Sequence, residues 1–190
     1  MEQNRVILIL LGIILLGASF LVDNEVPTFV EYVENPVFDY FFSGITHFGN
    51  VFIVLILITS MFLWNERKRE WIGPLWSAFI SSIVISYILK FLIARPRPIA
   101  DLSFAISAFN FSFPSTHAAA AFAALPILDK EFPKFKWFWI SFVMLVGLSR
   151  IYLGMHYLSD VIGGALLGYT IGFLFVYIED KYKLFRLKKF

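Results

Sequence analysis

The sequence predicts an all-α, polytopic membrane protein with six transmembrane helices. Two features of the composition support this class: 59% of the 190 residues are hydrophobic and only 16% are charged, whereas soluble domains average about 45–50% apolar and about 25% charged residues. The third feature is a series of long apolar runs, because a helix needs about 20 apolar residues to cross a bilayer. We expect one membrane-embedded domain over residues 1–190, since no internal repeat or low-complexity linker divides the chain.

The expected spans follow one another along the chain. They are residues 6–22, 51–64, 72–93, 118–128, 137–153 and 158–178. The second and fourth are shorter than a bilayer requires, so we expect them to extend into their flanks or to face a polar cavity instead of lipid. The first run could alternatively be a cleaved signal peptide, because Arg5 precedes it and small residues lie near its end.

The segment between the first two spans is aromatic and not plainly polar. Residues 35–49 read NPVFDYFFSGITHFG, a composition typical of an amphipathic helix lying in the membrane interface. Such a helix could form one wall of a lateral opening for a lipid, or it could simply anchor the chain through its aromatic side chains.

The distribution of Lys and Arg predicts the orientation. With six spans and both termini in the cytoplasm, twelve of the 16 basic residues lie on the cytoplasmic side, as in most membrane proteins. The basic tail, residues 181–190, is expected to hold the last helix end at anionic headgroups. The remaining four basic residues lie on the non-cytoplasmic side, against the rule, and need another explanation: Lys90, Arg95, Arg97 and Arg150.

Three polar clusters reach that same non-cytoplasmic side. They are KFLIARPRP at 90–98, FPSTHA at 113–118 and LSRIYLGMHYLSDV at 148–161. Lys90, Arg97 and Arg150 are fixed cations suited to a phosphate group. The PSTHAAAA stretch looks like a helix N-terminus, where free N–H groups bind phosphate and Ser115 can add a hydroxyl. Arg95 is expected only to extend along the membrane surface, and Lys90 and Arg97 could alternatively do the same.

Two histidines flank this predicted anion site. His156 and Asp160 are four residues apart, so on a helix they would share one face, and the carboxylate could orient the imidazole. His117 lies in the second cluster. A metal site is the competing interpretation, but three nearby cations would repel a divalent ion, and only Asp101 and Asp160 are available to compensate. We therefore predict no metal and no cofactor, with the cations neutralising the phosphoryl charge.

The motifs K-x6-RP at 90–98, PSTH at 114–117 and SR-x5-H-x3-D at 149–160 resemble the signature of the type 2 phosphatidic acid phosphatase family. Soluble bacterial acid phosphatases and vanadium haloperoxidases share that signature. One position departs from it, because Thr116 stands where the family usually has glycine. A β-branched residue needs a negative φ, which the first turn of a helix supplies.

The resemblance implies a role for each residue. His156 would be the nucleophile, Asp160 would orient it, and His117 would be the general acid and then the base. The phosphate oxygens would be held by the N–H groups of Thr116 and His117 and by the side chains of Lys90, Arg97, Ser115 and Arg150. The family implies no metal.

These expectations predict an integral lipid phosphatase of the cell membrane, acting at the outer face through a phosphohistidine. Undecaprenyl pyrophosphate is the favoured substrate, and phosphatidylglycerophosphate or phosphatidic acid is the alternative. A lipid phosphotransferase and a non-catalytic lipid-binding or transport protein are the rival functions. The expected partners are the bilayer and a lipid phosphate, with no nucleic acid, and the sequence predicts no oligomeric state.

Overall fold

The computed structural model describes residues 2–98 and 111–185. Within these ranges the chain is helical and contains no strand, which confirms the all-α prediction for the described residues. The α-helices are α1 (Glu2–Ser19), α2 (Glu25–Val33), α3 (Pro36–Thr46), α4 (Phe48–Phe52), α5 (Thr59–Asn65), α6 (Ile72–Ile93), α7 (Thr116–Glu131), α8 (Lys136–Tyr152) and α9 (Leu158–Tyr182). A π-helical turn over Ile53–Ile58 joins α4 to α5, and short 3₁₀ turns over Arg69–Trp71 and Pro133–Phe135 precede α6 and α8.

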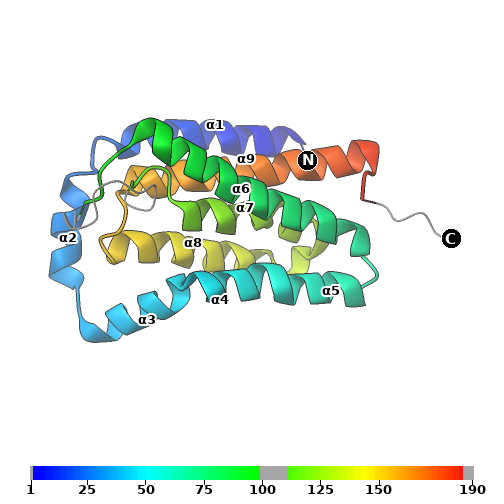
Figure 1. The fold of residues 1–190 in the computed structure, drawn as a ribbon, viewed down its shortest axis with the longest axis horizontal. Coiled ribbons are helices and arrows are strands. Elements are labelled where there is room, and N and C mark those ends of the chain that lie inside the picture. The colour runs from blue at the N-terminus through cyan, green and yellow to red at the C-terminus, as the bar shows by residue number, and fades with distance from the viewer. Residues whose placement is uncertain (1, 99–110, 186–190) are drawn as a thin grey trace.

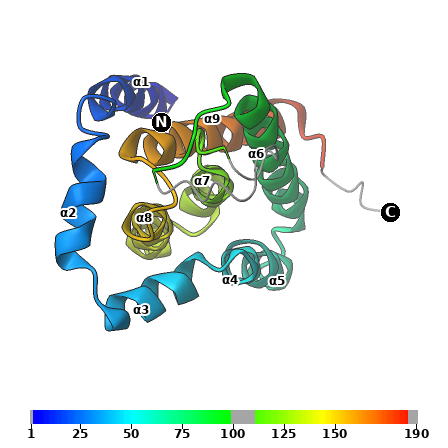
Figure 2. The ribbon, with the colours of Figure 1, turned by 60° about the vertical axis from the view of Figure 1, so that its left-hand side comes forward.

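The long helices run along one axis of the molecule, and α7 lies at their centre. Figure 1 shows α1, α6, α7, α8, α9 and the α4–α5 helix side by side, with α2 crossing one end of the bundle. Seen closer to end-on, α7 is surrounded by α6, α8, α9 and α4–α5, while α2 and α3 lie at the periphery (Figure 2). The end of α6, the start of α7 and the α8–α9 connection meet at the end of the bundle where α2 lies.

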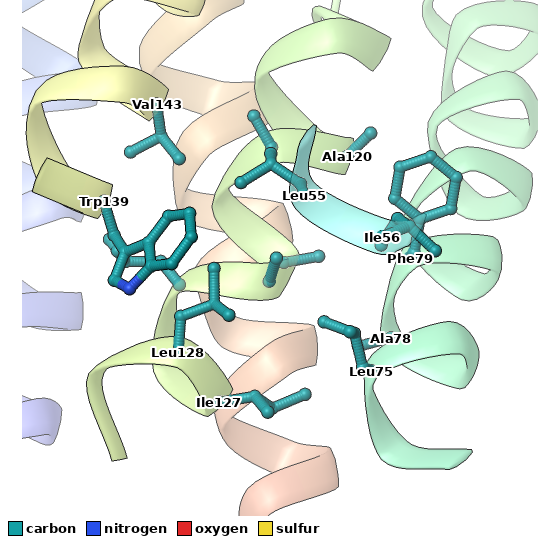
Figure 3. Packing of buried hydrophobic residues seen from close by; sticks show 14 of the residues in the cluster. Leu55, Ile56, Leu75, Ala78, Phe79, Ala120, Ile127, Leu128, Trp139 and Val143 are labelled. Carbon is teal, nitrogen blue, oxygen red and sulfur yellow. The ribbon is translucent and has the colours of Figure 1, made fainter. Parts of the chain in front are cut away.

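The central position of α7 explains why its apolar run is short. The helix extends beyond the predicted 118–128 to 16 residues, and eleven of them are buried, mostly alanines. Other helices surround it, so it does not have to present a lipid-facing surface of full bilayer length. A cluster of larger buried side chains on α4–α5, α6 and α8 packs around it, including Leu55, Phe79, Trp139 and Val143 (Figure 3).

Several helices of the described chain are long and apolar enough to cross a membrane. They are Arg69–Ile93, Pro133–Tyr152 and Leu158–Tyr182, and the pair Pro36–Thr46 and Gly49–Asn65, bent by 50°, is a fourth if it forms one span. The apolar part of α1, Val6–Ser19, is shorter. The protein is therefore membrane-embedded with several helices, and the six-span layout stays a prediction.

The helices α7 and α9 approach each other through three glycines spaced by four residues. A Cβ atom built on Gly164, Gly168 or Gly172 would lie 2.4, 2.0 or 2.2 Å from a backbone oxygen of α7 or its N-cap, Ser115. Small residues at this spacing allow close contact of helix backbones in membranes, where packing replaces the hydrophobic effect as the source of association. This contact fixes the start of α7 against the start of α9.

We expect Gly168→Ala to destabilise the protein by about 1–3 kcal/mol, the usual cost of overpacking a core. The added methyl meets the backbone oxygen of Ala119, which cannot move away without displacing α7. Thermal unfolding in detergent measures the effect. Gly17→Ala is the matched control, because nothing lies within 4 Å of a Cβ at Gly17. Equal melting temperatures for the two variants would contradict the close contact.

Candidate active site

The three polar clusters predicted from the sequence meet at one end of the bundle, and backbone groups tie them together. The Lys90 ammonium donates to the carbonyl oxygens of Phe111 (2.7 Å) and Ser112 (3.0 Å). The N–H of Ser112 donates to the Arg95 carbonyl at 2.8 Å, and the N–H of Ser115 donates to the Asp160 carbonyl at 2.9 Å. Each of the three segments is therefore held in place by another.

A cavity of about 120 Å³ lies where these segments meet. Six predicted site residues line it, together with one residue that was not predicted: Lys90, Arg97, Thr116, His117, Arg150 and His156, with Tyr87. The space holds several water molecules and suits a single phosphoryl group better than a large headgroup.

Three of the lining side chains are cations, Lys90 and Arg97 from the first polar cluster and Arg150 from the third. Lys90 on α6 and Arg150 on α8 are 3% and 8% exposed. Arg97 donates from Nη1 to the Met155 carbonyl at 3.0 Å, and burial lowers the pKa of its guanidinium below the ordinary value. Arg150 donates from Nη1 to Thr46 Oγ1 at 2.9 Å, while its buried Nε has no hydrogen-bond partner within the described residues. Placing these cations together in one small cavity raises the free energy of the folded protein, through burial and mutual repulsion. A bound anion offsets that increase.

The N-terminus of α7 forms another wall of the cavity. Ser115 is the N-cap, and its Oγ accepts the N–H of Ala118 at 3.4 Å. The N–H groups of Thr116 and His117 occupy the first two positions of the helix, where backbone donors lack partners inside the helix. Thr116 has helical backbone angles, as expected for a residue replacing glycine at this position. Ser115 is buried and does not line the cavity, so the predicted contact of its hydroxyl with phosphate stays a prediction.

His156 and Asp160 lie together, but not on a shared helix face. The sequence-based expectation was wrong here, because α9 begins at Leu158 and His156 precedes it. Asp160 is the third residue of the helix, and its Oδ2 accepts the N–H of the N-cap Tyr157 at 2.9 Å. The same oxygen lies 3.5 Å from His156 Nδ1. Catalytic hydrogen bonds are often this long without substrate and shorten when it binds.

The surroundings of His156 keep its imidazole neutral. Burial is the main cause, and together with the cations Lys90, Arg97 and Arg150 it lowers the pKa to about 4, although the Asp160 carboxylate acts in the opposite direction. The ring is therefore unprotonated at neutral pH. Nδ1 faces Asp160, so the geometry allows the other ring nitrogen, Nε2, to act on a ligand in the cavity.

Sequence reasoning missed several contributors to this site. Tyr87 lines the cavity, and its position one helical turn before Lys90 on α6 was the available signal. Thr46, at the end of α3, contacts Arg150. The expectation that Arg95 only extends along the membrane surface was wrong, since its guanidinium lies 2.8 Å from both Asp23 and Asp160.

The described residues contain no group of three or more His, Cys, Asp or Glu side chains placed to hold a metal ion. Asp101, the second carboxylate considered in the competing metal interpretation, lies outside the described residues.

The sequence profile of the PAP2 superfamily matches residues 70–183, a range that contains every residue lining the cavity. The chain belongs to the PAP2 superfamily. Among curated PAP2 proteins, it is 33% identical to phosphatidylglycerophosphatase B of Bacillus subtilis, with 87% of each chain aligned. It is 31% identical to undecaprenyl-diphosphatase BcrC of the same organism, over 77% of this chain and 78% of that one.

The fold agrees with this assignment. The crystal structure of a transmembrane PAP2-type phosphatidylglycerolphosphate phosphatase from Bacillus subtilis superposes with a TM-score of 0.71 and 25% sequence identity, covering 96% of this chain and 98% of that chain. The PAP2 relatives are phosphatases that act on phosphate ester and pyrophosphate bonds. This PAP2 protein is accordingly a membrane-embedded phosphatase, a hydrolase of the same class.

Proposed function

We propose that this PAP2 protein hydrolyses a lipid pyrophosphate or phosphomonoester, with undecaprenyl pyrophosphate as the favoured substrate, through a phosphohistidine at His156. One observation carries the proposal: three cations, two histidines and a helix N-terminus from three separate segments line a single small cavity. The relatives' names support both leading substrates, since one is a phosphatidylglycerophosphatase and another an undecaprenyl-diphosphatase.

Binding is the work of the cations and the helix N-terminus. Lys90, Arg97 and Arg150 surround the oxygens of the terminal phosphoryl group, and the first N–H groups of α7 donate to the same oxygens. These donors are fixed before the reaction begins, so they stabilise the charge that develops on the oxygens in the transition state. In this mechanism they take the place of a metal ion.

Two displacements at phosphorus complete the reaction. Neutral His156 attacks through Nε2 and forms the N–P bond as the P–O bond to the lipid breaks, while His117 gives its proton to the leaving oxygen. Asp160 stabilises the positive charge that the ring of His156 acquires. His117 then removes a proton from water, the oxygen of that water attacks phosphorus, and the N–P bond breaks to release inorganic phosphate.

The membrane setting selects the substrate class. In the six-span arrangement, both termini are cytoplasmic and the cavity opens on the non-cytoplasmic side, within one domain of residues 1–190. A substrate whose tail remains in the bilayer then reaches the cavity at headgroup depth. The exposed aromatic side chains Phe29, Tyr32 and Tyr40 on α2 and α3 support an interfacial location for these two helices beside the site.

A panel of defined lipid phosphates, assayed with one detergent-purified preparation, tests this function. We expect free phosphate from undecaprenyl pyrophosphate at the highest kcat/KM, followed by phosphatidylglycerophosphate, and unchanged rates in the presence of EDTA. Label transferred to an acceptor instead of released would indicate a phosphotransferase. Turnover of none of the lipids, or inhibition by EDTA that added metal reverses, would contradict the proposal.

A further inference from the structure

Arg95 joins the α6–α7 connection to two buried carboxylates and a serine. Its Nη1 donates to Asp160 Oδ1 at 2.8 Å and to Ser159 Oγ at 2.6 Å. Its Nη2 donates to Asp23 Oδ2 at 2.8 Å. The guanidinium carbon also lies 4.1 Å from the centre of the Tyr157 ring, which adds a cation–π contact.

Asp23 completes this arrangement from the connection between α1 and α2. It is only 2% exposed. Its Oδ1 accepts a hydrogen bond from the N–H of Ser159 at 2.9 Å. Its Oδ2 accepts hydrogen bonds from the Ser159 hydroxyl and from the Arg95 guanidinium. The Arg95 clamp, defined here as Arg95 with Asp23 and Ser159, therefore attaches the start of α9 to a segment more than seventy residues earlier than Arg95.

The clamp contacts one of the two oxygens of Asp160. Oδ1 is occupied by Arg95, which leaves Oδ2 for the Tyr157 N–H and for His156 Nδ1. Asp160 is completely buried and lies within electrostatic range of Lys90 and Arg97. Without Arg95, the carboxylate could rotate toward those cations, where it would compete with phosphate and leave the imidazole unsupported.

We propose that Arg95 and Asp23 are positioning residues of the reaction: Asp23 orients Arg95, and Arg95 holds Asp160 in the rotamer that serves His156. The inference rests on the proposed phosphohistidine mechanism and extends it to two residues to which the motifs assign no role: Arg95 occupies one of the unspecified positions of K-x6-RP, and Asp23 lies outside all three motifs. A purely structural role, in which the clamp only attaches α1 and α2 to α9, is the alternative to be distinguished.

Steady-state kinetics of Arg95→Gln and Asp23→Asn test the proposal. We expect kcat for Arg95→Gln to fall on the order of 10²-fold, as for small misplacements of catalytic groups, with KM changed less than about twofold because the cavity cations remain. Asp23→Asn should show a smaller loss of the same kind. In an Asp160→Asn background, Arg95→Gln should have no further effect on kcat, because the group that it positions is already altered.

The pH profile gives a second readout that a structural role would not change. Removing the Arg95 cation leaves the negative charge of Asp160 less neutralised, which favours the protonated ring of His156, so the acidic limb of the kcat profile should move to higher pH in Arg95→Gln. Arg95→Lys keeps the charge and should leave that limb in place. The titratable and charged groups facing His156 from the surrounding elements, all unchanged in these variants, are Lys90, Arg97, His117, Arg150 and Asp160.

Lys130→Gln is the matched control, since it removes an ion pair between α7 and α9, to Asp180, at the far end of the same helices. It should leave kcat and the pH profile unchanged. The proposal is overturned if Arg95→Gln lowers only the melting temperature, or if its effect on kcat is undiminished in the Asp160→Asn background. If Arg95→Gln does not fold, the same measurements of kcat, pH profile and melting temperature on Asp23→Asn test the proposal. Failure of the proposed function would look different, because His156→Ala would then remain active.

Discussion

Replacement of His156 by alanine is expected to abolish lipid phosphatase activity, with kcat lowered by roughly 10⁶-fold, as for removal of the nucleophile in a serine protease. No other side chain lining the cavity is placed against Asp160 in the same way, so none can take over the attack on phosphorus. Release of phosphate from the preferred lipid, measured in detergent at saturating substrate, gives the effect directly.

Two further measurements make this result interpretable. The His156→Ala protein should still fold and melt in one cooperative transition, since the contact between the ring and Asp160 in the described residues is long, at 3.5 Å. His47→Ala is the matched control, because His47 is an exposed histidine between α3 and α4 and does not line the cavity. Substantial activity in His156→Ala, or equal losses in both variants, would refute the nucleophile assignment.

Replacement of His117 by alanine is expected to lower kcat by about 10²–10⁴-fold, the usual contribution of general acid–base catalysis. The change in KM should be small, because the cations and N–H groups that bind phosphate are retained. With p-nitrophenyl phosphate, whose leaving group needs no proton, the rate of the first displacement should change little. Attack of water should still be slow, so the phosphorylated enzyme should accumulate.

A comparison of burst and steady-state rates for the two kinds of substrate distinguishes this role from a binding role. We expect His117→Ala to give a burst of p-nitrophenol followed by a slow steady state. A loss confined to KM, identical for both substrates, would show that His117 binds phosphate without moving a proton.

The sequence predicted what depends on local pattern. The motif residues Lys90, Arg97, His117 and Arg150 were expected at one site because alternate spans return to the same side of a membrane, and the structure brings all four to one cavity. The helices α6, α8 and α9 begin at or next to the expected residues, because their apolar runs are long, whereas the short apolar run of α7 underestimated its length.

Contacts between segments far apart in the sequence could not be predicted from local pattern. Arg150 is held by Thr46, 104 residues earlier, and Arg95 by Asp23, 72 residues earlier. Nothing in the spacing of these residues indicates that they meet. The bias of basic residues even suggested a surface role for Arg95, because a rule about charge distribution cannot recognise a cation that is paired inside the protein.

Two other features were encoded locally but need the structure to be understood. Gly164, Gly168 and Gly172 have the spacing of a close helix contact, and the structure identifies α7 as the partner. His156 and Asp160 have the spacing of a helix face, yet the helix starts between them, and the capping interaction of Asp160 brings the pair together instead. Spacing alone does not distinguish these two geometries.

The central claim is that phosphate is transferred to His156, and trapping the intermediate tests it most directly. His117→Ala, incubated with p-nitrophenyl phosphate, is quenched in alkali and digested, and the peptides are analysed by mass spectrometry. The account predicts phosphate on the peptide containing His156, bound through nitrogen and labile to acid, and its absence from the His117→Ala/His156→Ala double variant. Phosphate on another residue, or turnover without any phosphorylated peptide, would contradict it.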